Sequence, residues 1–88
     1  MQVWKFPLRP AGVNEIEMPK GAEVLTIDTQ LGYPMMWAKV DPHAEKEIRH
    51  FRVAGTGHEL GSGVGEHLGT LQARGGALVF HVFEMYGL

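Results

Sequence analysis

The sequence predicts an all-β or mainly β protein: a small antiparallel sheet, sandwich or barrel of about six to seven short strands. At most one short helical turn is expected. The chain has 88 residues, which suits a single domain over residues 1–88. Glycine supplies 12 of those residues, more than the usual share of about 7%. Prolines and glycines also cut the apolar runs short, and no run supports a helix of about ten residues.

The N-terminal part contains two short apolar runs. Residues 3–6 form an apolar and aromatic run that prolines 7 and 10 close. Residues 14–18 alternate between polar and apolar side chains, and Pro19 and Gly21 follow as a turn signal. Both runs predict brief strands.

Residues 23–29 and 35–41 predict a β-hairpin. The first run is rich in β-branched residues, which favour strands. Simple alternation places Leu25 on the same face as Ile27. Residues 30–34 read as the connection between the two strands.

The middle of the chain predicts a loop and then a strand. Residues 42–46 are polar, and Asp41 followed by Pro42 is able to start one helical turn. Residues 47–53 alternate, with Arg49 on the face of Phe51 and Val53. Arg52 therefore belongs to the opposite face.

The last part predicts a glycine-rich loop and a hairpin. Residues 55–65 hold the loop, residues 67–73 a weaker strand, and Gly75-Gly76 a turn. Residues 77–85 are almost continuously apolar and predict a central strand buried on both faces. The turn spacing favours a meander. Uncovered strand edges invite pairing, so a homo-oligomer is expected.

Charge and composition exclude several classes of protein. Eight basic against ten acidic residues give a formal net charge of −2, whereas nucleic-acid binders carry a basic excess. The chain has no cysteine, hence no disulfide, thiolate zinc site or cysteine nucleophile. It shows no signal peptide and no stretch of about 20 apolar residues. The expectation is a soluble intracellular protein with neither nucleic-acid nor membrane partners.

The glycine-rich loop is the clearest candidate for ligand contact. Glycines let the backbone approach a ligand and let successive amides form an anion-binding nest. The loop matches neither a dinucleotide-binding fingerprint nor a P-loop. The alternative is a mobile hairpin loop. The predicted contact residues are Gly55, Thr56, Gly57 and His58.

Arginines and aromatic side chains suggest a nucleotide as one possible ligand. Arg49, Arg52 and Trp37 supply the groups that hold phosphate and stack on a base. The two arginines lie on opposite faces of a regular strand, so one chain cannot direct both into one pocket. The alternative is that these charges protect sheet edges from aggregation.

Metal binding and catalysis are not expected. The five histidines show no HxH or HExxH spacing. His58 and His67 flank the loop and are able to approach each other, whereas His81 is expected to be a buried, hydrogen-bonded core residue. A Ser62–His58–Glu66 arrangement would lie in one flexible segment, which suits catalysis poorly. The sequence predicts no enzyme, metal or cofactor.

Five segments carry a resemblance to a known family: residues 4–8 (WKFPL), 18–25 (MPKGAEVL), 37–42 (WAKVDP), 51–60 (FRVAGTGHEL) and 68–84 (LGTLQARGGALVFHVFE). In these segments the chain resembles short proteins encoded by bacteriophages and prophages, over nearly its whole length. The resemblance implies an accessory protein in the host cytoplasm and implies no reaction. The functional hypothesis is a small protein that binds a host protein during infection. The alternative is a sponge that sequesters a nucleotide-type defence signal through residues 55–65 and nearby arginine and aromatic residues. A hydrolase and a virion component are weaker alternatives.

Overall fold

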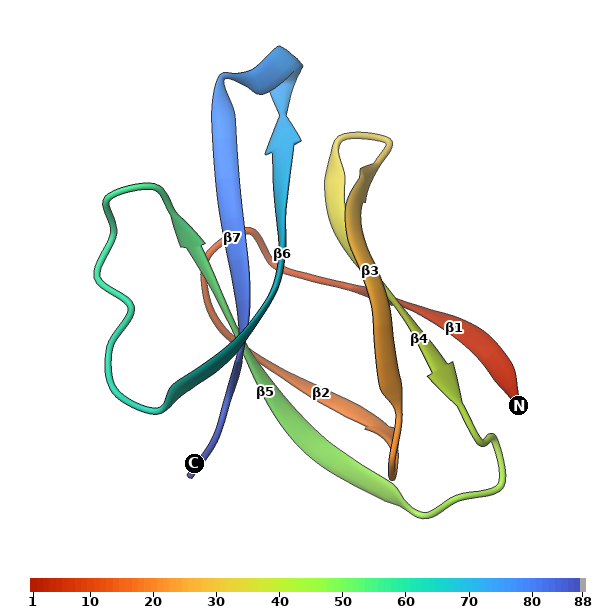
Figure 1. The fold of residues 1–88 in the computed structure, drawn as a ribbon. Coiled ribbons are helices and arrows are strands. Elements are labelled where there is room, and N and C mark those ends of the chain that lie inside the picture. Colours follow the sequence, from red (N-terminus) through yellow and green to blue (C-terminus); the bar gives the residue numbers. More distant parts are fainter. Residues whose placement is uncertain (88) are drawn as a thin grey trace.

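The computed structural model describes residues 1–87 and confirms the all-β class (Figure 1). Seven strands form two antiparallel sheets, and a single 3-10 turn is the one helical element of the described residues. The strands are β1 (Gln2–Pro7), β2 (Gly12–Pro19), β3 (Glu23–Gln30), β4 (Tyr33–Val40), β5 (Lys46–Gly55), β6 (Val64–Ala73) and β7 (Leu78–Met85), with the 3-10 turn at Arg74–Gly76. Within residues 1–87, no helix is long and apolar enough to cross a membrane.

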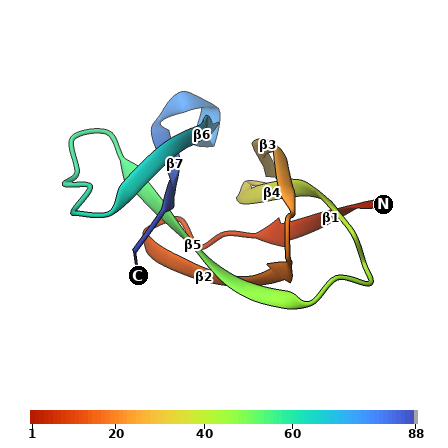
Figure 2. The ribbon, with the colours of Figure 1, turned by 60° about the horizontal axis from the view of Figure 1, so that its bottom comes forward.

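The strand order shows that the predicted meander is wrong. The three-stranded sheet has the order β1-β4-β3, and the four-stranded sheet has the order β2-β5-β7-β6. Only β3–β4 and β6–β7 are hairpins of consecutive strands. The chain changes sheet after β1, after β2 and after β4. These crossings allow both sheets to cover one shared core, and Figure 2 shows the two layers from a second side.

The core lies between the facing sides of the two sheets. Met36, Ala38 and Val40 alternate along β4 with more exposed residues, and each is fully buried. Phe51 and Val53 of β5 belong to the same cluster and are also fully buried. This alternation is the pattern of a sheet that buries one face.

One buried polar side chain fixes the first crossing between the sheets. Asn14 is 4% exposed. Its Oδ1 accepts a hydrogen bond from the Arg9 amide at 2.7 Å, and its Nδ2 donates to the Arg9 carbonyl at 3.2 Å. The side chain thereby satisfies backbone groups that lie between β1 and β2 and belong to no ladder.

A β-bulge in β3 overturns the predicted pairing of Leu25 with Ile27. Val24 pairs with Ala38 and Thr26 pairs with the next residue along β4, so Leu25 is an extra residue without a register partner. Val24 and Ile27 therefore face the core, and Leu25 is 48% exposed. Beyond a bulge the two faces of a strand exchange, which simple alternation does not reveal.

Strand β7 is central, as predicted, because it lies between β5 and β6. The expectation that both of its faces are buried is wrong. Val82 and Glu84 are buried on the inner face, whereas His81 and Phe83 on the outer face are only half-buried. Among residues 1–87, no second sheet covers that outer side. The glycine-rich segment beside it supplies only partial cover.

The predicted loop at residues 42–46 and hairpin at residues 30–34 are both confirmed. The possible helical turn after Asp41 is a simple turn, in which the Ala44 amide donates to the Asp41 carbonyl at 3.1 Å. The Asp41 carboxylate accepts from the His43 amide at 3.0 Å. The β3–β4 hairpin turns at Leu31 and Gly32, which both adopt positive φ angles.

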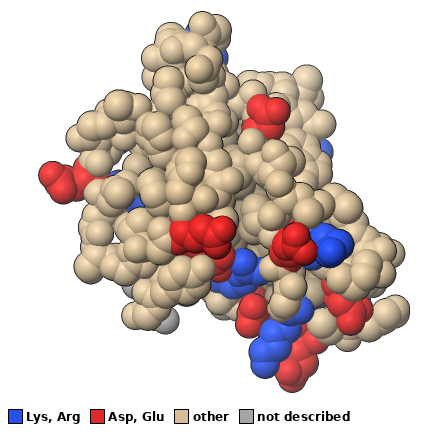
Figure 3. Space-filling view, viewed as in Figure 1, with Lys and Arg blue, Asp and Glu red and all other residues tan. Residues whose placement is uncertain are grey.

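Charged side chains are unevenly distributed over the surface. In Figure 3 most of the lysine, arginine, aspartate and glutamate atoms on the visible face gather in its lower centre and lower right. Lys20–Glu45 and Lys39–Glu23 are two of the exposed ion pairs among residues 1–87. The upper and left parts of that face carry few charges. The same regions contain β7 and the glycine-rich loop (Figure 1).

The close approach of β6 to β3 depends on Gly69. A β-carbon at this position would lie 3.0 Å from the Ile27 Cβ, closer than carbon atoms pack. We expect Gly69→Ala to lower the free energy of unfolding by about 1–3 kcal/mol, because the added methyl group overpacks the core. Urea unfolding measures the change. The Gly69→Ala/Ile27→Ala double variant should lose less than the sum of the single variants, and strict additivity would contradict this packing account.

Candidate functional site

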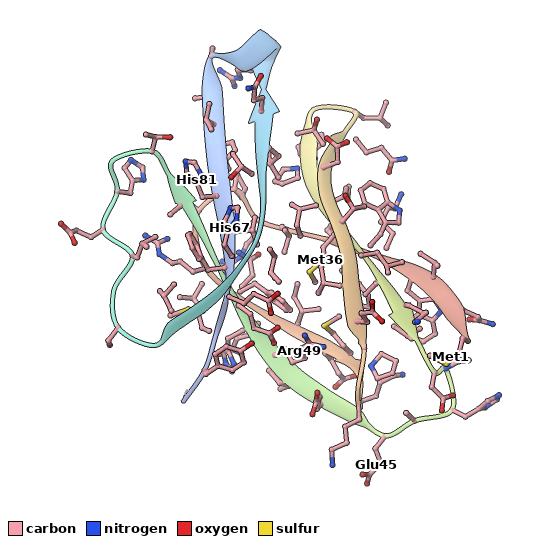
Figure 4. All side chains as sticks on the ribbon, in the orientation of Figure 1. Met1, Met36, Glu45, Arg49, His67 and His81 are labelled. Carbon is pink, nitrogen blue, oxygen red and sulfur yellow. The ribbon has the colours of Figure 1, made fainter. Side chains whose placement is uncertain are left out.

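A chain of four hydrogen-bonded side chains lies on the outer face of the four-stranded sheet. Thr56 Oγ1 lies 2.8 Å from His81 Nε2, and Thr70 Oγ1 lies 3.1 Å from His81 Nδ1. His67 Nε2 lies 2.9 Å from Thr70 Oγ1. Figure 4 labels both histidines on neighbouring strands. The β-ladder accounts for this grouping, because Ala54 of β5 and Thr70 of β6 both pair with His81 of β7.

The directions of these hydrogen bonds depend on one another. A neutral histidine donates from one ring nitrogen and accepts at the other, and a threonine hydroxyl does both. If Thr70 donates to His81 Nδ1, then His81 Nε2–H donates to Thr56, and the Thr70 oxygen accepts from His67 Nε2–H. In the opposite tautomer, His81 Nδ1–H donates to Thr70 and His81 Nε2 accepts from Thr56, while the Thr70–His67 bond is free to run in either direction, because a hydroxyl oxygen has two lone pairs. The chain therefore satisfies both nitrogens of His81 and fixes its ring.

The glycine-rich loop is attached to the sheet by Arg52. The guanidinium donates to the Glu59 carbonyl at 2.6 Å and to the Leu60 carbonyl at 3.3 Å. It also donates to the Val53 carbonyl at 2.8 Å. Gly57 and Gly61 adopt φ angles of +89° and +83°, which only glycine takes up readily. The loop thus has a defined path, fixed at Thr56 on one side and at residues 59–60 on the other.

Two shallow hollows border this loop. One has a volume of about 210 Å³ and is lined by residues 54–58 together with Leu60, His81 and Phe83. The other, of about 280 Å³, lies beyond the end of β5 and is lined mainly by residues 77–80. Gly55, Thr56 and His58 line both. We call the two together the loop hollow.

The loop hollow is uncharged and partly apolar. Among residues 1–87, no lysine, arginine, aspartate or glutamate lines either part. The His58 ring lies against the backbone of Gly55, where a β-carbon would come 3.0 Å from His58 Cε1. Glycine at position 55 therefore lets the His58 ring fold back over the strand end.

The structure separates the predicted ligand-binding residues into four places. Gly55, Thr56, Gly57 and His58 line the loop hollow together. Arg52 lies under the loop and uses its donors on backbone carbonyls. Arg49 faces the interior, which confirms the opposite orientation of the two arginines. Trp37 belongs to the other sheet, opposite Lys5 of β1. A single chain therefore does not gather these groups into one nucleotide pocket.

Arg49 forms a buried ion pair with Glu84. Its Nε and Nη2 donate to the two Glu84 carboxylate oxygens, each at 2.7 Å, and Nη1 donates to the Ala22 carbonyl. The side chains are 17% and 9% exposed. The hydrogen bonds to Glu84 raise the pKa of Arg49 above its ordinary value, although burial acts in the opposite direction. A raised pKa stabilises the fold at every pH below the ordinary pKa of arginine, so this contribution persists over the ordinary pH range.

The sequence did not predict that three residues of the site lie together, namely His81, Thr70 and His67. His81 is hydrogen-bonded as predicted, but it lies half-buried on the outer face and not in the core. His67 packs on Phe83, with ring centroids 5.1 Å apart. Its hydrogen-bond partner is Thr70, and His58 lies against Gly55, so the two histidines that flank the loop have different neighbours. Within residues 1–87, no group of three or more potential ligands is placed to hold a metal ion.

These features define a small two-sheet antiparallel β protein whose outer surface carries a hydrogen-bonded, uncharged hollow. The chain belongs to the family described as "Domain of unknown function (DUF7352)", whose sequence model matches residues 1–87. No curated protein and no solved structure matches the chain.

Removing Arg49 tests the role of the buried ion pair. We expect Arg49→Met to lower the free energy of unfolding by about 3–5 kcal/mol, because Glu84 is left buried without a counter-charge. The double variant Arg49→Met/Glu84→Leu removes both charges and should recover most of this loss. Urea unfolding of the two variants measures these changes in the free energy of unfolding. A double variant that is no more stable than the single one would refute the unpaired-charge explanation.

Removing Arg52 tests the attachment of the loop. Arg52→Ala should speed hydrogen exchange of the backbone amides in residues 57–62 about tenfold or more, because charge-assisted hydrogen bonds to two loop carbonyls are lost. Exchange in β4 should change little. Arg74→Ala, at the exposed β6–β7 turn, is the matched control. Equal exchange in the loops of the wild type and Arg52→Ala would show that other contacts hold the loop.

Proposed function

We propose that this protein acts by binding a protein partner through the loop hollow. The observation that carries the proposal is the fixed path of residues 56–60 beside an exposed, uncharged recess. A binding surface that is already ordered loses less conformational entropy when a partner docks. The Arg52 contacts and the Thr56–His81 hydrogen bond supply that order.

The chemistry of the loop hollow favours a protein over a phosphate-containing ligand. Its apolar lining comes from Leu60, Phe83 and the first residues of β7, and its polar side chains are the Thr56 hydroxyl and the His58 and His81 imidazoles. The cores of protein interfaces are depleted in charged residues and enriched in aromatic ones. Phosphate sites, by contrast, use arginine, lysine or a row of free amides. The low charge of this region in Figure 3 supports the same choice.

The resemblance to phage and prophage proteins suggests the origin of the partner. We infer that the partner is a host protein, bound during infection in the host cytoplasm. In this proposal the protein works by occupying a surface of its partner, without catalysis, and needs neither a cofactor nor a nucleic acid. The two segments GTGH and VFHVFE, which contribute to the resemblance, meet at the Thr56–His81 hydrogen bond.

Sequestration of a nucleotide-type signal is retained as the alternative prediction. Its simplest form uses Arg49, Arg52 and Trp37 in one pocket. Arg49 is bonded to Glu84, Arg52 to the loop carbonyls, and Trp37 lies on the other sheet. A nucleotide site would therefore need the loop amides and the histidines alone, or groups from another chain.

Paired arginine substitutions on the loop test the protein-binding proposal. Thr56→Arg places bulk and charge at the loop hollow and removes the His81 hydrogen bond, whereas Ser62→Arg makes a similar change on the same loop outside the lining residues. Tagged protein is used to capture partners from host lysate. The wild type and Ser62→Arg should retain one dominant protein, and Thr56→Arg should lose about 90% of it, a tenfold effect that corresponds to about 1.4 kcal/mol.

Two outcomes would contradict this proposal. Retention of the partner by Thr56→Arg, with unfolding unchanged, would place the contact elsewhere. A rise in melting temperature with cyclic nucleotides or ADP-ribose-type compounds would favour the sponge, because a ligand that binds only the folded state stabilises it by RT ln(1+[L]/Kd).

A further inference from the structure

We propose that Thr56 is an acyl acceptor, a nucleophilic hydroxyl that takes a short acyl group from a thioester. The proposal concerns covalent chemistry at the edge of the loop hollow. It goes beyond the proposed function, because it does not depend on a protein partner, and it adds one acyl group per chain without turnover. The observation that carries it is the hydrogen-bonded order of side chains from Thr56 to His67.

The Thr56 hydroxyl has the surroundings of an activated nucleophile. Its Oγ1 lies 2.8 Å from His81 Nε2, which is within reach for proton transfer. The other ring nitrogen of His81 lies 3.1 Å from Thr70 Oγ1, so a third group orients the base. A nucleophile, a base and a group that orients the base form the recurring arrangement of reactive hydroxyls. The three side chains occur here in that order.

The direction of the hydrogen bonds that this chemistry needs is compatible with the whole chain of side chains. For His81 Nε2 to accept the Thr56 proton, His81 Nδ1–H must donate to Thr70. The Thr70 oxygen has two lone pairs, so the hydroxyl accepts this bond and still bonds to His67 Nε2 at 2.9 Å. The tautomer that reacts therefore leaves neither ring nitrogen of His81 without a partner.

Three strands of one sheet fix the positions of these groups. His81 lies on β7, Thr70 pairs with it from β6, and Thr56 follows the end of β5. Paired strands hold their side chains at set spacings, which is the rigid support that a reactive site needs. The loop after Thr56 is also fixed, because Arg52 donates to two of its carbonyls. Thr56 itself is exposed, so an acyl donor has access to the hydroxyl.

The residue after Thr56 supplies a donor for the carbonyl oxygen of the acyl group. The Gly57 amide donates no hydrogen bond within residues 1–87, whereas the His58 amide donates to the Gly55 carbonyl at 3.1 Å. Gly57 also lines the loop hollow beside Thr56. In hydrolases with a serine nucleophile, the amide after the nucleophile stabilises the oxyanion of the tetrahedral intermediate. We expect the Gly57 amide to bind the oxyanion in the same way.

The loop hollow favours a short acyl group and a neutral leaving group. The part that Gly57 lines has a volume of about 210 Å³, below the roughly 300–1,000 Å³ of pockets for drug-sized ligands. Its apolar side chains are Leu60 and Phe83, which suit an alkyl chain. Among residues 1–87, no lysine or arginine lines it, so a phosphate leaving group would find no counter-charge. A thioester instead releases a thiol, which is neutral once it is protonated.

The transfer balances with the groups present. Thr56 Oγ1 attacks the carbonyl carbon of the thioester, and the hydroxyl proton passes to His81 Nε2. The carbon–sulfur bond then breaks, and His81 returns the proton to the sulfur atom. The products are an ester of Thr56 and one free thiol, with His81 neutral again and no change of oxidation state.

Acetyl transfer from a small neutral thioester, S-acetyl-N-acetylcysteamine, tests the proposal. Fragment mass spectrometry of the wild type should find an acetyl ester at Thr56 and none at Thr26, an exposed threonine of the other sheet. Neutral hydroxylamine should remove the Thr56 group, because it cleaves esters, and should leave lysine amides intact. With acetyl phosphate, acetylation of Thr56 relative to the lysines in the same sample should be about tenfold lower.

Substitutions assign the roles of the three side chains. Thr56→Val should abolish the ester, and Thr56→Ser should retain it. His81→Gln should slow acylation about 100-fold or more, because a general base contributes that much to proton transfer. Thr70→Val should slow it about tenfold and Thr70→Ser should restore it to within about threefold, as expected of a residue that positions the base. Thermal unfolding of each variant verifies that it is folded.

Three results would overturn the proposal. One is a folded wild type that carries no ester at Thr56 after exposure to the thioester. Another is an equal rate of Thr56 acylation in the wild type and in folded His81→Gln. A third, equal relative acylation by acetyl phosphate and the thioester, would overturn the choice of donor. None of these assays measures partner capture, so their failure is distinct from a failure of the protein-binding proposal.

Discussion

The Arg49 guanidinium, bonded to Glu84 on the neighbouring strand, also reaches the Ala22 carbonyl, which no ladder connects to the four-stranded sheet. Arg49 comes from β5, Glu84 from β7, and the Ala22 carbonyl from the segment that enters the opposite sheet. The planar guanidinium presents its donors in a fixed fork, so one side chain holds all three. In a chain of 88 residues without cysteine, the small core leaves few other ways to fix one sheet against the other.

The direction of Arg49 also determines what its neighbour does. Because side chains alternate along a strand, three residues further on Arg52 must point to the opposite side. There it meets the carbonyls of residues 59 and 60 and holds the loop against the outer face. One strand thus supplies one arginine to join the layers and another to order the candidate site. Glycines between β5 and β6 allow Arg52 to order the loop, because the chain must turn back over the sheet to bring the carbonyls of residues 59 and 60 to the Arg52 donors.

The sequence predicted the local features well and the long-range ones poorly. The hairpin at residues 30–34, the central position of β7 and the opposite faces of the two arginines follow from turn residues and alternation, which act over a few positions. The bulge at Leu25 is different, because it is set by how β3 meets β4 and β6 and leaves no mark in the alternation itself. The strand order is also a long-range feature, because it depends on which sheet the chain enters each time it crosses between the two. Burial of the core, shared by both sheets, decides that order.

For the candidate site, too, the sequence predicted the local features and missed the long-range contacts. The glycine content indicates the glycine-rich loop, whereas the residues that this loop contacts do not follow from the composition. Thr56 meets His81 across 25 positions, and Thr70 meets it across 11, so their contact appears only after β5, β6 and β7 are paired. His81 lies between apolar neighbours in the sequence, which is the pattern of a core residue. The same pattern arises when an outer sheet face is only partly covered.

The shape of the molecule explains why its chemistry lies on outer faces. The Cα atoms extend over 39 by 30 by 16 Å, so the protein is thin in one direction. Two sheets packed about 10 Å apart leave room for one layer of interdigitated side chains between them. Every strand therefore gives half of its side chains to the core and the other half to a surface. On one surface those side chains form the Thr56–His81–Thr70–His67 chain, and on the other Trp37 lies half-buried between β1 and β3. A protein of this build therefore presents its polar and aromatic side chains on two opposed sheet faces.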